Sequence, residues 1–424
     1  MAKKARKEWQ HSLKLLLARV QCGAGQCSKL SGPEKKKLLW KIADELLRSQ
    51  KKIQSENKKD LKQAEKNGLS SAMIDRLTLN PQRIQAMAKG VRTVANLPDP
   101  IGRVMGSWKR PNGLQIRRLS VPIGVILIIY ESRPNVTVEC ASLALKSGNG
   151  VILRGGKEAF YSNRILVSIF KKVLKRFALS EDIVSFITTT DRQAVDFLLK
   201  RDQDIQLVIP RGGESLIRKV ARLSRIPVIK HYQGICHVYL DQYADVKKAI
   251  AIALNAKMQR TGVCNAMETL LVHKKIAPAV LPRLGLLYHQ AGCEMRADES
   301  ARRHIPLAKK AKPSDFGREF LDKIVAIKTV GSIDDAIAHI GRYGSGHTEA
   351  IVSKNSKALT QFLSEVDSSS VMANASTRFS DGFEYGFGAE IGISTDKIHA
   401  RGPMGLEGLT SYKYIVQGNG QIRT

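Results

Sequence analysis

One cysteine, Cys264, stands in a stretch whose composition suits a reactive thiol. It follows a helical pattern and a polar loop that contains Gly262, and it precedes the apolar run 269–272. Such a loop can expose a sulfur to substrate and surround it with backbone N–H groups that lower the pKa of the thiol. The alternative is a buried structural cysteine, because free cysteines are among the most buried residues. The polar neighbours on both sides favour the nucleophile.

Three loops that follow apolar, strand-like runs carry residues suited to binding anions. In the first, Asn135 is able to cap the helix that follows. The second contains Lys157 after two glycines, and the third contains Gly212 and Gly213 after an arginine. Paired glycines and a cation beside a helix start can receive a phosphate, although Gly-Gly often only makes the turn. Neither loop matches G-x-G-x-x-G or the P-loop, so these residues alone leave both a nucleotide site and plain turns open.

Two loops in the second half of the chain add further candidates. His347 precedes the strand-like run 350–352 and is either catalytic or, as we favour, a loop histidine that makes hydrogen bonds. Arg378 lies in the polar stretch 374–379, just before a glycine-rich segment, and its guanidinium is available for a carboxylate.

The elements that would position these residues follow a regular order. Residues 9–96 show a helical pattern, and a Pro-Asn-Gly turn then introduces the strand 114–122, which we read as one arm of a hairpin. Strands then alternate with helices, which predicts a parallel, doubly wound sheet whose ligands bind beyond the carboxyl ends of the strands. The expected strands are 124–130, 151–153, 183–187, 205–209 and 227–229, and the expected helices are 136–146, 159–177, 193–200 and 214–223.

A second strand–helix region follows the helix 245–257 and contains the strands 269–272, 324–327 and 350–352 with the helix 333–340. The tail ends in a strand near 414–416, which is able to pair with the arm at 114–122 or with another subunit.

Length and composition limit the class of protein. A chain of 424 residues can hold two domains, and 43% hydrophobic with 25% charged residues is typical of a soluble protein. The longest apolar run, 121–130, is shorter than the ~20 residues that span a membrane, and no signal peptide is evident, so we expect a cytoplasmic protein. The six cysteines show no spacing typical of zinc, so we expect reduced thiols and no metal site.

The net charge is the unusual feature. There are 69 Lys and Arg residues against 38 Asp and Glu residues, a balance of +31. The basic residues are spread along the chain and only 6% of residues are aromatic, so nucleic-acid binding is not expected as the main role. A diffuse positive field would also attract small anions such as phosphorylated substrates.

Several long stretches together resemble the γ-glutamyl phosphate reductase family, also called glutamate-5-semialdehyde dehydrogenases, of the aldehyde dehydrogenase superfamily. The resemblance covers nearly the whole chain from about residue 42 onward, and Thr261 departs from it where a proline is expected. It is carried by the stretches 130–137, 152–158, 209–213, 264–272, 375–379 and 399–407.

The resemblance implies an aldehyde dehydrogenase-like α/β fold with three parts. Residues 1–110 and 126–257 would form a doubly wound NADPH-binding domain, to which 375–397 returns. Residues 258–374 would form an α/β catalytic domain that carries the cysteine. Residues 111–125 and 398–424 would form a β oligomerisation arm, so that a homo-oligomer, a dimer or a dimer of dimers, is expected.

The resemblance also implies a reaction and roles for residues. The chain would reduce L-glutamyl 5-phosphate with NADPH to L-glutamate 5-semialdehyde and phosphate, in proline biosynthesis, through a Cys264 thioester. Asn135 and the Cys264 N–H would hold the oxyanion. Cofactor contacts would come from Lys157, Gly212, Gly213 and Glu319. Recognition of the substrate carboxylate by Ser376, Thr377 and Arg378 is a hypothesis that the polar, glycine-flanked loop itself motivates.

Further expectations concern partners and rival functions. Glutamate 5-kinase is the protein that would supply the labile acyl phosphate. The stretch 230–234 lacks the glutamate base that hydrolytic members of the superfamily carry there. The rivals are a CoA-acylating aldehyde dehydrogenase, which would use the same thiol, and a basic nucleic-acid-binding protein.

Overall fold

The computed structural model describes residues 2–423, and within them the chain forms two compact units. The first contains the chain up to Lys230 together with Phe387–Gly392 and the segment from Met404 onward. The second contains His231–Gly386 and Ile393–Pro403. None of the described helices is both long enough and apolar enough to cross a bilayer.

The first unit begins with five helices, as the helical pattern predicts. Local capping explains where they start: Ser31 and Glu34 form a reciprocal capping box, and Asn80 caps the fifth helix before Pro81. The apolar stripe of the second helix, including Leu38 and Ile42, is fully buried. The helices are α1 (Ala2–Cys27), α2 (Gly32–Arg48), α3 (Gln50–Lys66), α4 (Ser71–Leu77) and α5 (Pro81–Asn96).

A four-stranded parallel sheet of order β5-β4-β3-β6 forms the centre of this unit. All six residues of β3 are buried, which agrees with its unbroken apolar sequence. The expected strand 227–229 makes only an isolated bridge, Val208 to Val228. The strands are β3 (Val125–Tyr130), β4 (Gly150–Arg154), β5 (Val184–Phe186) and β6 (Leu207–Arg211); the helices between and after them are α6 (Pro134–Lys146), η1 (Lys157–Ala159), α7 (Phe160–Arg176), η2 (Glu181–Ile183), α8 (Arg192–Leu198) and α9 (Glu214–Leu223).

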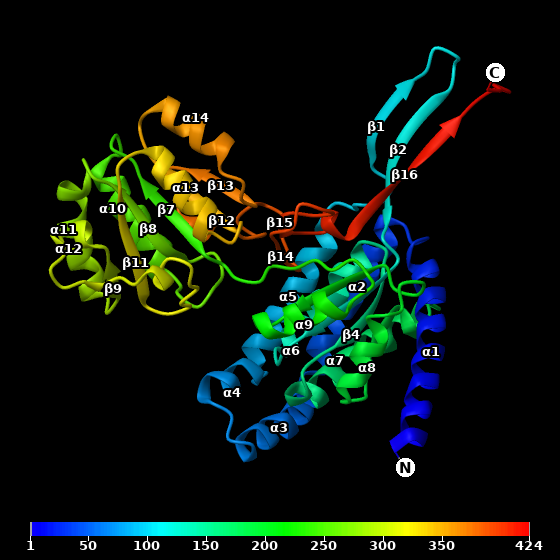
Figure 1. Ribbon diagram of the computed structural model, residues 1–424. Helices are drawn as coiled ribbons and strands as arrows, with labels where there is room; N and C mark the ends of the chain where they lie inside the picture. Colours follow the sequence, from blue (N-terminus) through cyan, green and yellow to red (C-terminus); the bar gives the residue numbers. More distant parts are fainter. Residues whose placement is uncertain (1, 424) are drawn as a thin grey trace. The chain divides into compact units, whose positions relative to one another are not determined.

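An antiparallel arm belongs to the same unit and consists of β1 (Val104–Lys109), β2 (Gln115–Pro122) and β16 (Thr410–Gln417). Figure 1 shows these strands as a ribbon that projects away from the helices of the unit. The hairpin is therefore confirmed, and the tail strand pairs with it along its whole length, from Thr410 opposite Pro122 to Gln417 opposite Gln115.

The second unit is built on a seven-stranded parallel sheet of order β10-β9-β11-β8-β7-β12-β13. Successive residues pack on opposite faces: Leu270 lies in the core cluster that includes residues of α10 and α11, and Leu271 in the cluster that includes residues of α13 and α14. The strands are β7 (Cys236–Leu240), β8 (Met267–His273), β9 (Glu294–Ala297), β10 (Lys309–Lys310), β11 (Ile324–Val330), β12 (Thr348–Val352) and β13 (Ser370–Ala373); the helices are α10 (Val246–Met258), α11 (Ala277–Gln290), α12 (Glu299–Arg302), α13 (Ile333–Tyr343) and α14 (Ser356–Glu365).

The remaining short elements are η3 (Pro313–Asp315), η4 (Thr377–Phe379), β14 (Gly392–Ser394), β15 (Gly402–Met404) and η5 (Glu407–Leu409), with β14 and β15 paired to each other.

The domain boundaries differ from those expected in two places. Residues 231–257 were expected in the first domain, but β7 pairs with both β8 and β12, so this segment is an integral part of the second sheet. Of the segment 375–397, only Phe387–Gly392 belongs to the first unit. In both places the boundary follows strand pairing and packing, which a change in sequence pattern does not mark.

Candidate active site

Cys264 lies in a turn between the end of α10 and the start of β8. The turn is closed by a hydrogen bond from the Ala266 N–H to the Val263 carbonyl. The side chain is partly exposed, whereas Cys27, Cys140, Cys236 and Cys293 are buried and Cys22 is exposed on α1. The position thus agrees with the expected accessible thiol at the end of a helix.

The backbone of Cys264 is held by the segment that precedes β7. The Cys236 thiol donates to the Cys264 carbonyl oxygen, with a sulfur–oxygen distance of 3.2 Å. Gly234 packs directly on the same peptide, and a Cβ at this position would overlap the Cys264 carbonyl and Cα. Burial raises the pKa of Cys236 well above the ordinary thiol value, so Cys236 remains a hydrogen-bond donor rather than a second thiolate.

A buried ion pair joins the two ends of the loop that carries Cys264. Lys257 Nζ, in the last turn of α10, lies 2.5 Å from Glu268 Oε2, on β8, and both side chains are inaccessible to solvent. The other oxygen, Oε1, accepts the Leu321 N–H at 3.1 Å. Burial raises the pKa of Glu268 to about 7, while the charge of Lys257 acts in the opposite direction.

Arg378 is the cation that the structure brings near the thiol. Its Nε donates to Gln259 Oε1 at 2.8 Å, and its carbonyl and that of Ser380 accept the side-chain amide of Asn265, the residue after Cys264. Burial lowers the pKa of Arg378, as does the neighbouring Arg260, while the Cys264 thiolate acts in the opposite direction. Arg260 is a second cation at this place that sequence reasoning missed, although it stands four residues before Cys264.

The two residues before Arg378 are placed differently. Ser376 is buried and its hydroxyl accepts the Arg378 N–H at 3.3 Å, which starts η4. Thr377 is fully buried as well. The Ser376 hydroxyl therefore supports the conformation of the loop, whereas the Thr377 Oγ1 atom is buried without a hydrogen-bond partner among the described residues. Arg378 is the partly exposed member of this predicted trio.

His347 is a buried residue of the second unit. Its Nδ1 lies 2.8 Å from Thr348 Oγ1 and 3.6 Å from Cys236 Sγ. Burial lowers the pKa of His347 to about 3, so that the ring is neutral at physiological pH. This geometry agrees with the favoured interpretation, a histidine that makes hydrogen bonds inside the structure.

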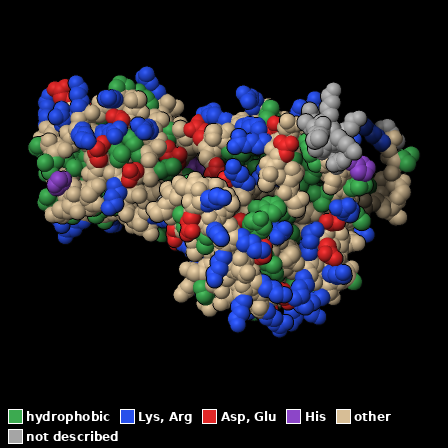
Figure 2. All heavy atoms as spheres, turned by 90° about the horizontal axis from the view of Figure 1, so that it is seen from below, with side chains coloured by type: hydrophobic (Ala, Val, Ile, Leu, Met, Phe, Trp, Pro, Cys, Tyr) green, Lys and Arg blue, Asp and Glu red, His purple; other side chains and the backbone are tan. Residues whose placement is uncertain are grey.

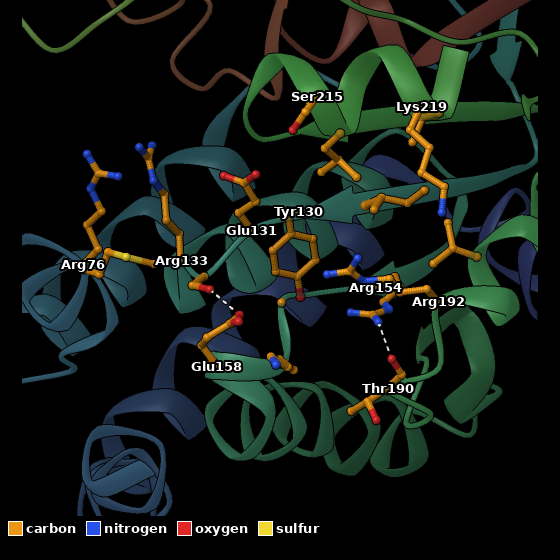
Figure 3. A pocket seen from close by; sticks show the side chains of 18 of the residues that line it. Arg76, Tyr130, Glu131, Arg133, Arg154, Glu158, Thr190, Arg192, Ser215 and Lys219 are labelled. Atoms are coloured by element: carbon orange, nitrogen blue, oxygen red, sulfur yellow. Dashed lines mark hydrogen bonds between the residues drawn. The ribbon is translucent and has the colours of Figure 1, made fainter. Parts of the chain in front are cut away.

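A cavity of about 640 Å³ opens beyond the carboxyl ends of the strands in the first unit. Figure 3 shows Arg76 and Arg133 at one end of this cavity and Arg154 and Lys219 toward the other. The cations that line it are Arg76, Arg133, Arg154, Lys157, Arg192 and Lys219, against the carboxylates of Glu131 and Glu158.

The paired glycines at the start of α9 do face an anionic oxygen. Gly213 is the N-cap of this helix, and its N–H donates to Glu131 Oε1 at 3.0 Å. Gly212 has the Glu131 carboxyl so close that a Cβ would lie 2.6 Å from its Cδ. A carboxylate thus occupies the place where the sequence predicts a phosphate.

Sequence reasoning identified one of the six cations that line this cavity, Lys157, and missed Arg76, Arg133, Arg154, Arg192 and Lys219. Arg154 ends β4, and its Nη2 donates to the Thr190 carbonyl at 3.3 Å, while its Nε is buried with no hydrogen-bond partner in the described part of the chain. The position of Arg154 at a strand end is a signal that could have identified it. Arg192 and Lys219 come from α8 and α9, and only the tertiary structure brings them to this cavity.

The predicted site residues divide between the two units. Asn135 lies with Lys157, Gly212 and Gly213 in the first. It is exposed in the first turn of α6, which starts at Pro134 after Arg133 as N-cap, so the expected cap by Asn135 is wrong. Glu319 lies in the second unit with Cys264 and Arg378, and its Oε1 accepts the Gly234 N–H at 2.9 Å.

Positive charge is spread over the surface rather than concentrated. On the face shown in Figure 2, Lys and Arg side chains occur over many separate places, with fewer Asp and Glu side chains between them. The distribution agrees with the scattered basic residues in the sequence.

Comparison with known proteins identifies the family to which this chain belongs. A model of the aldehyde dehydrogenase family matches residues 14–311. The gamma-glutamyl phosphate reductase of Carboxydothermus hydrogenoformans is 54% identical over 396 residues, which are 93% of this chain and 95% of the relative. The chain belongs to the aldehyde dehydrogenase family and, within it, to the gamma-glutamyl phosphate reductases.

Solved structures agree with this placement. The crystal structure of gamma-glutamyl phosphate reductase from Thermotoga maritima is 45% identical, with a TM-score of 0.96 over 97% of this chain and 100% of that one. An acetylating aldehyde dehydrogenase from Geobacillus thermoglucosidasius is 16% identical, with a TM-score of 0.67 over 98% of both chains, a likeness of fold alone. The expected aldehyde dehydrogenase-like α/β fold is therefore confirmed.

Proposed function

We infer that this chain reduces L-glutamyl 5-phosphate to L-glutamate 5-semialdehyde with release of phosphate, a step of proline biosynthesis. The relatives that share half of its residues over nearly their whole length carry the name of this reductase. The observation that carries the proposal within the molecule is Cys264, a partly exposed thiol in a held turn with cations beside it.

The chemistry of the thiol accounts for the reaction. The Cys264 thiolate attacks the acyl carbonyl of the substrate, the carbon–oxygen bond to phosphate breaks, and a thioester forms. The Cys264 N–H and the Asn135 amide are proposed to stabilise the oxyanion. A nicotinamide cofactor would supply hydride to the thioester carbon, and breaking of the carbon–sulfur bond would then release the aldehyde and regenerate the Cys264 thiolate.

Arg378, together with Arg260, is proposed to bind the negative charge of the substrate. An acyl phosphate with an α-carboxylate carries anionic groups at both ends, and guanidinium groups bind phosphate and carboxylate through paired hydrogen bonds. After burial, the charge of Arg260 is the second cause that lowers the pKa of Arg378, so the two guanidinium groups lie close enough to repel, and a bound anion would relieve that repulsion.

The cavity of the first unit fits a phosphorylated dinucleotide, and we propose NADPH. Six cations line it, and the buried Arg154 Nε lacks a hydrogen-bond partner among the residues that the structure describes. Lys157 is proposed to bind the adenosine ribose and its phosphate, with Arg154 and Arg192 adding positive charge. The start of α9 at Gly212 and Gly213 would take the pyrophosphate after the Glu131 carboxylate moves away. Glu319 is proposed to contact the nicotinamide ribose.

The segment beside the thiol supports reduction rather than hydrolysis. Gly234 lies on the Cys264 backbone, and the residues before it are His231, Tyr232 and Gln233. This stretch offers no carboxylate that could activate water as a general base. We therefore propose that the thioester on Cys264 persists long enough to be reduced.

We also propose how the subunits assemble, where the enzyme works and which protein supplies its substrate. The arm of β1, β2 and β16 would join subunits into a dimer or a dimer of dimers in the cytoplasm, and glutamate 5-kinase would supply the acyl phosphate. A CoA-acylating activity is the alternative, but the acetylating relative resembles the chain only in fold.

The reverse reaction tests the proposal. Reduction of NADP by glutamate 5-semialdehyde should require phosphate, and Cys264→Ala should lower kcat by more than about 1,000-fold. Cys22→Ser, which removes the exposed thiol on α1, is the matched control and should retain activity. Turnover that requires CoA instead of phosphate, or an active Cys264→Ala variant, would refute the proposed reaction.

A further inference from the structure

The contacts around Cys264 form a closed series that passes through four separate segments of the second unit. It begins with Lys257 at the end of α10, which pairs with Glu268 on β8 at 2.5 Å. Glu268 uses its second oxygen to hold the Leu321 N–H at 3.1 Å. Each carboxylate oxygen therefore binds a different segment.

The series returns to the thiol from the other side. Two residues before Leu321, Glu319 accepts the Gly234 N–H at 2.9 Å. Gly234 in turn packs so closely on the Cys264 peptide that no side chain fits between them. We name the residues Lys257, Glu268, Leu321, Glu319 and Gly234 the Cys264 clamp.

Two further observations show that this arrangement is built around the loop. Leu321 has a backbone φ of 53°, which residues other than glycine rarely adopt. Its N–H is the group that donates to the Glu268 carboxylate. The side chains of Lys257 and Glu268 have no accessible surface. This ion pair, whose desolvation costs free energy, therefore connects the end of α10 to the start of β8.

We propose that the buried Lys257–Glu268 pair is a positioning device for the nucleophile: it fixes the span of the loop 258–267 and connects it to the segment of Glu319, so that Cys264 is held in place for attack. Neither residue touches the substrate in this account. The inference rests on the proposed role of Cys264 in the reduction.

Replacing both residues of the pair separates a role in positioning Cys264 from a role in stabilising the fold. Removing one partner of a buried pair leaves an unpaired charge and destabilises the fold, whereas replacing both by apolar residues of similar volume is often neutral or stabilising. The Lys257→Met/Glu268→Met variant should therefore fold but lack the clamp. Because a displacement of about 1 Å can cost ~100-fold in rate, its kcat should fall about 10- to 100-fold.

The experiment uses the full chain with Cys22→Ser, so that Cys264 is the accessible cysteine among the described residues. The rate at which iodoacetamide alkylates Cys264 is measured against pH by peptide mass spectrometry. Thermal unfolding, kcat and the KM for NADP are measured on the same variants. The control is Tyr288→Phe, which removes a buried hydrogen bond of 2.8 Å to the Ala253 carbonyl on α10 but leaves the clamp intact.

The double variant should unfold at a temperature no lower than that of the parent, and its KM for NADP should stay within twofold of the parental value. Its kcat should be lower than that of the parent, and the pH dependence of Cys264 alkylation should be displaced. The Tyr288→Phe variant should keep the parental kcat and profile. A double variant whose kcat or alkylation profile matches that control would overturn the proposal. Since alkylation needs no substrate, failure of the proposed function would appear separately, as turnover by Cys264→Ala.

Discussion

At the scale of single residues, the site depends on which polar groups remain accessible after folding. Ser376, Thr377 and Arg378 look equivalent in the sequence as ligands for a carboxylate. In the structure the first two are buried in the loop, and Arg378 keeps a partly exposed guanidinium near Cys264. This polar stretch thus contains one partly exposed residue suited to substrate, Arg378, and one residue whose hydroxyl holds the backbone of the loop, Ser376.

Arg378→Ala should raise the KM for glutamate 5-semialdehyde, which carries the carboxylate in the reverse reaction, about 10- to 100-fold, because a hydrogen bond to a charged group is worth roughly 1.5–3 kcal/mol. Steady-state kinetics with glutamate 5-semialdehyde measure this. Thr377→Val, a buried change of similar volume beside it, should leave that KM within a few-fold. An unchanged KM in Arg378→Ala would remove Arg378 from the substrate site.

At the scale of elements, the arm shows how strands far apart in sequence combine. β16 joins β2 from a distance of almost 300 residues, and the three strands expose Val104, Trp108, Tyr412, Tyr414 and Val416. The rings of Trp108 and Tyr414 pack edge to face at 6.2 Å. An isolated three-stranded sheet with exposed apolar side chains is typical of a surface that another chain covers.

Tyr414→Glu on β16 should therefore reduce the oligomeric state at micromolar concentration, since a charge on an apolar contact surface opposes association. Sedimentation velocity measures the distribution of species. A chain that ends at Gly418 leaves β16 complete and serves as the control. If Tyr414→Glu sediments like the parent, the arm does not join subunits through this strand.

At the scale of the whole molecule, burial of ionisable groups makes stability depend on pH. Burial, followed by the charge of His237, lowers the pKa of His339 to about 3, and His347 is affected in the same direction. The folded protein keeps these rings neutral, whereas the unfolded chain binds protons below about pH 6.5. Their contribution to stability is therefore complete above pH 6.5 and is lost as pH falls toward 3.

The free energy of unfolding should fall by about 2 kcal/mol per buried histidine between pH 8 and pH 5. His339→Phe, which keeps an aromatic ring against Phe316 and Tyr343, should reduce this dependence by one such contribution. Urea denaturation at a series of pH values checks it. An equal slope in the variant and the parent would show that His339 is protonated in the folded state.

The sequence by itself determined the order of elements and the class of fold. Unbroken apolar runs and caps such as Ser31 act through neighbouring residues, so the helices up to Asn96, the buried strand β3 and the turn at Cys264 were predictable. The expected strand 227–229 forms only a single bridge to Val208, because a short apolar run does not reveal how far its pairing with a neighbouring strand extends.

Only the tertiary structure decided which side chains surround the thiol. The contacts of Gly234, Glu319 and Lys257 join segments far apart in sequence, and hydrogen bonds of this kind leave no periodic pattern. The placement of β7 in the second sheet and of Arg192 at the cavity of the first unit also depends on contacts between segments far apart in sequence. Local propensity depends on adjacent residues, whereas burial and pairing depend on what the rest of the chain brings near.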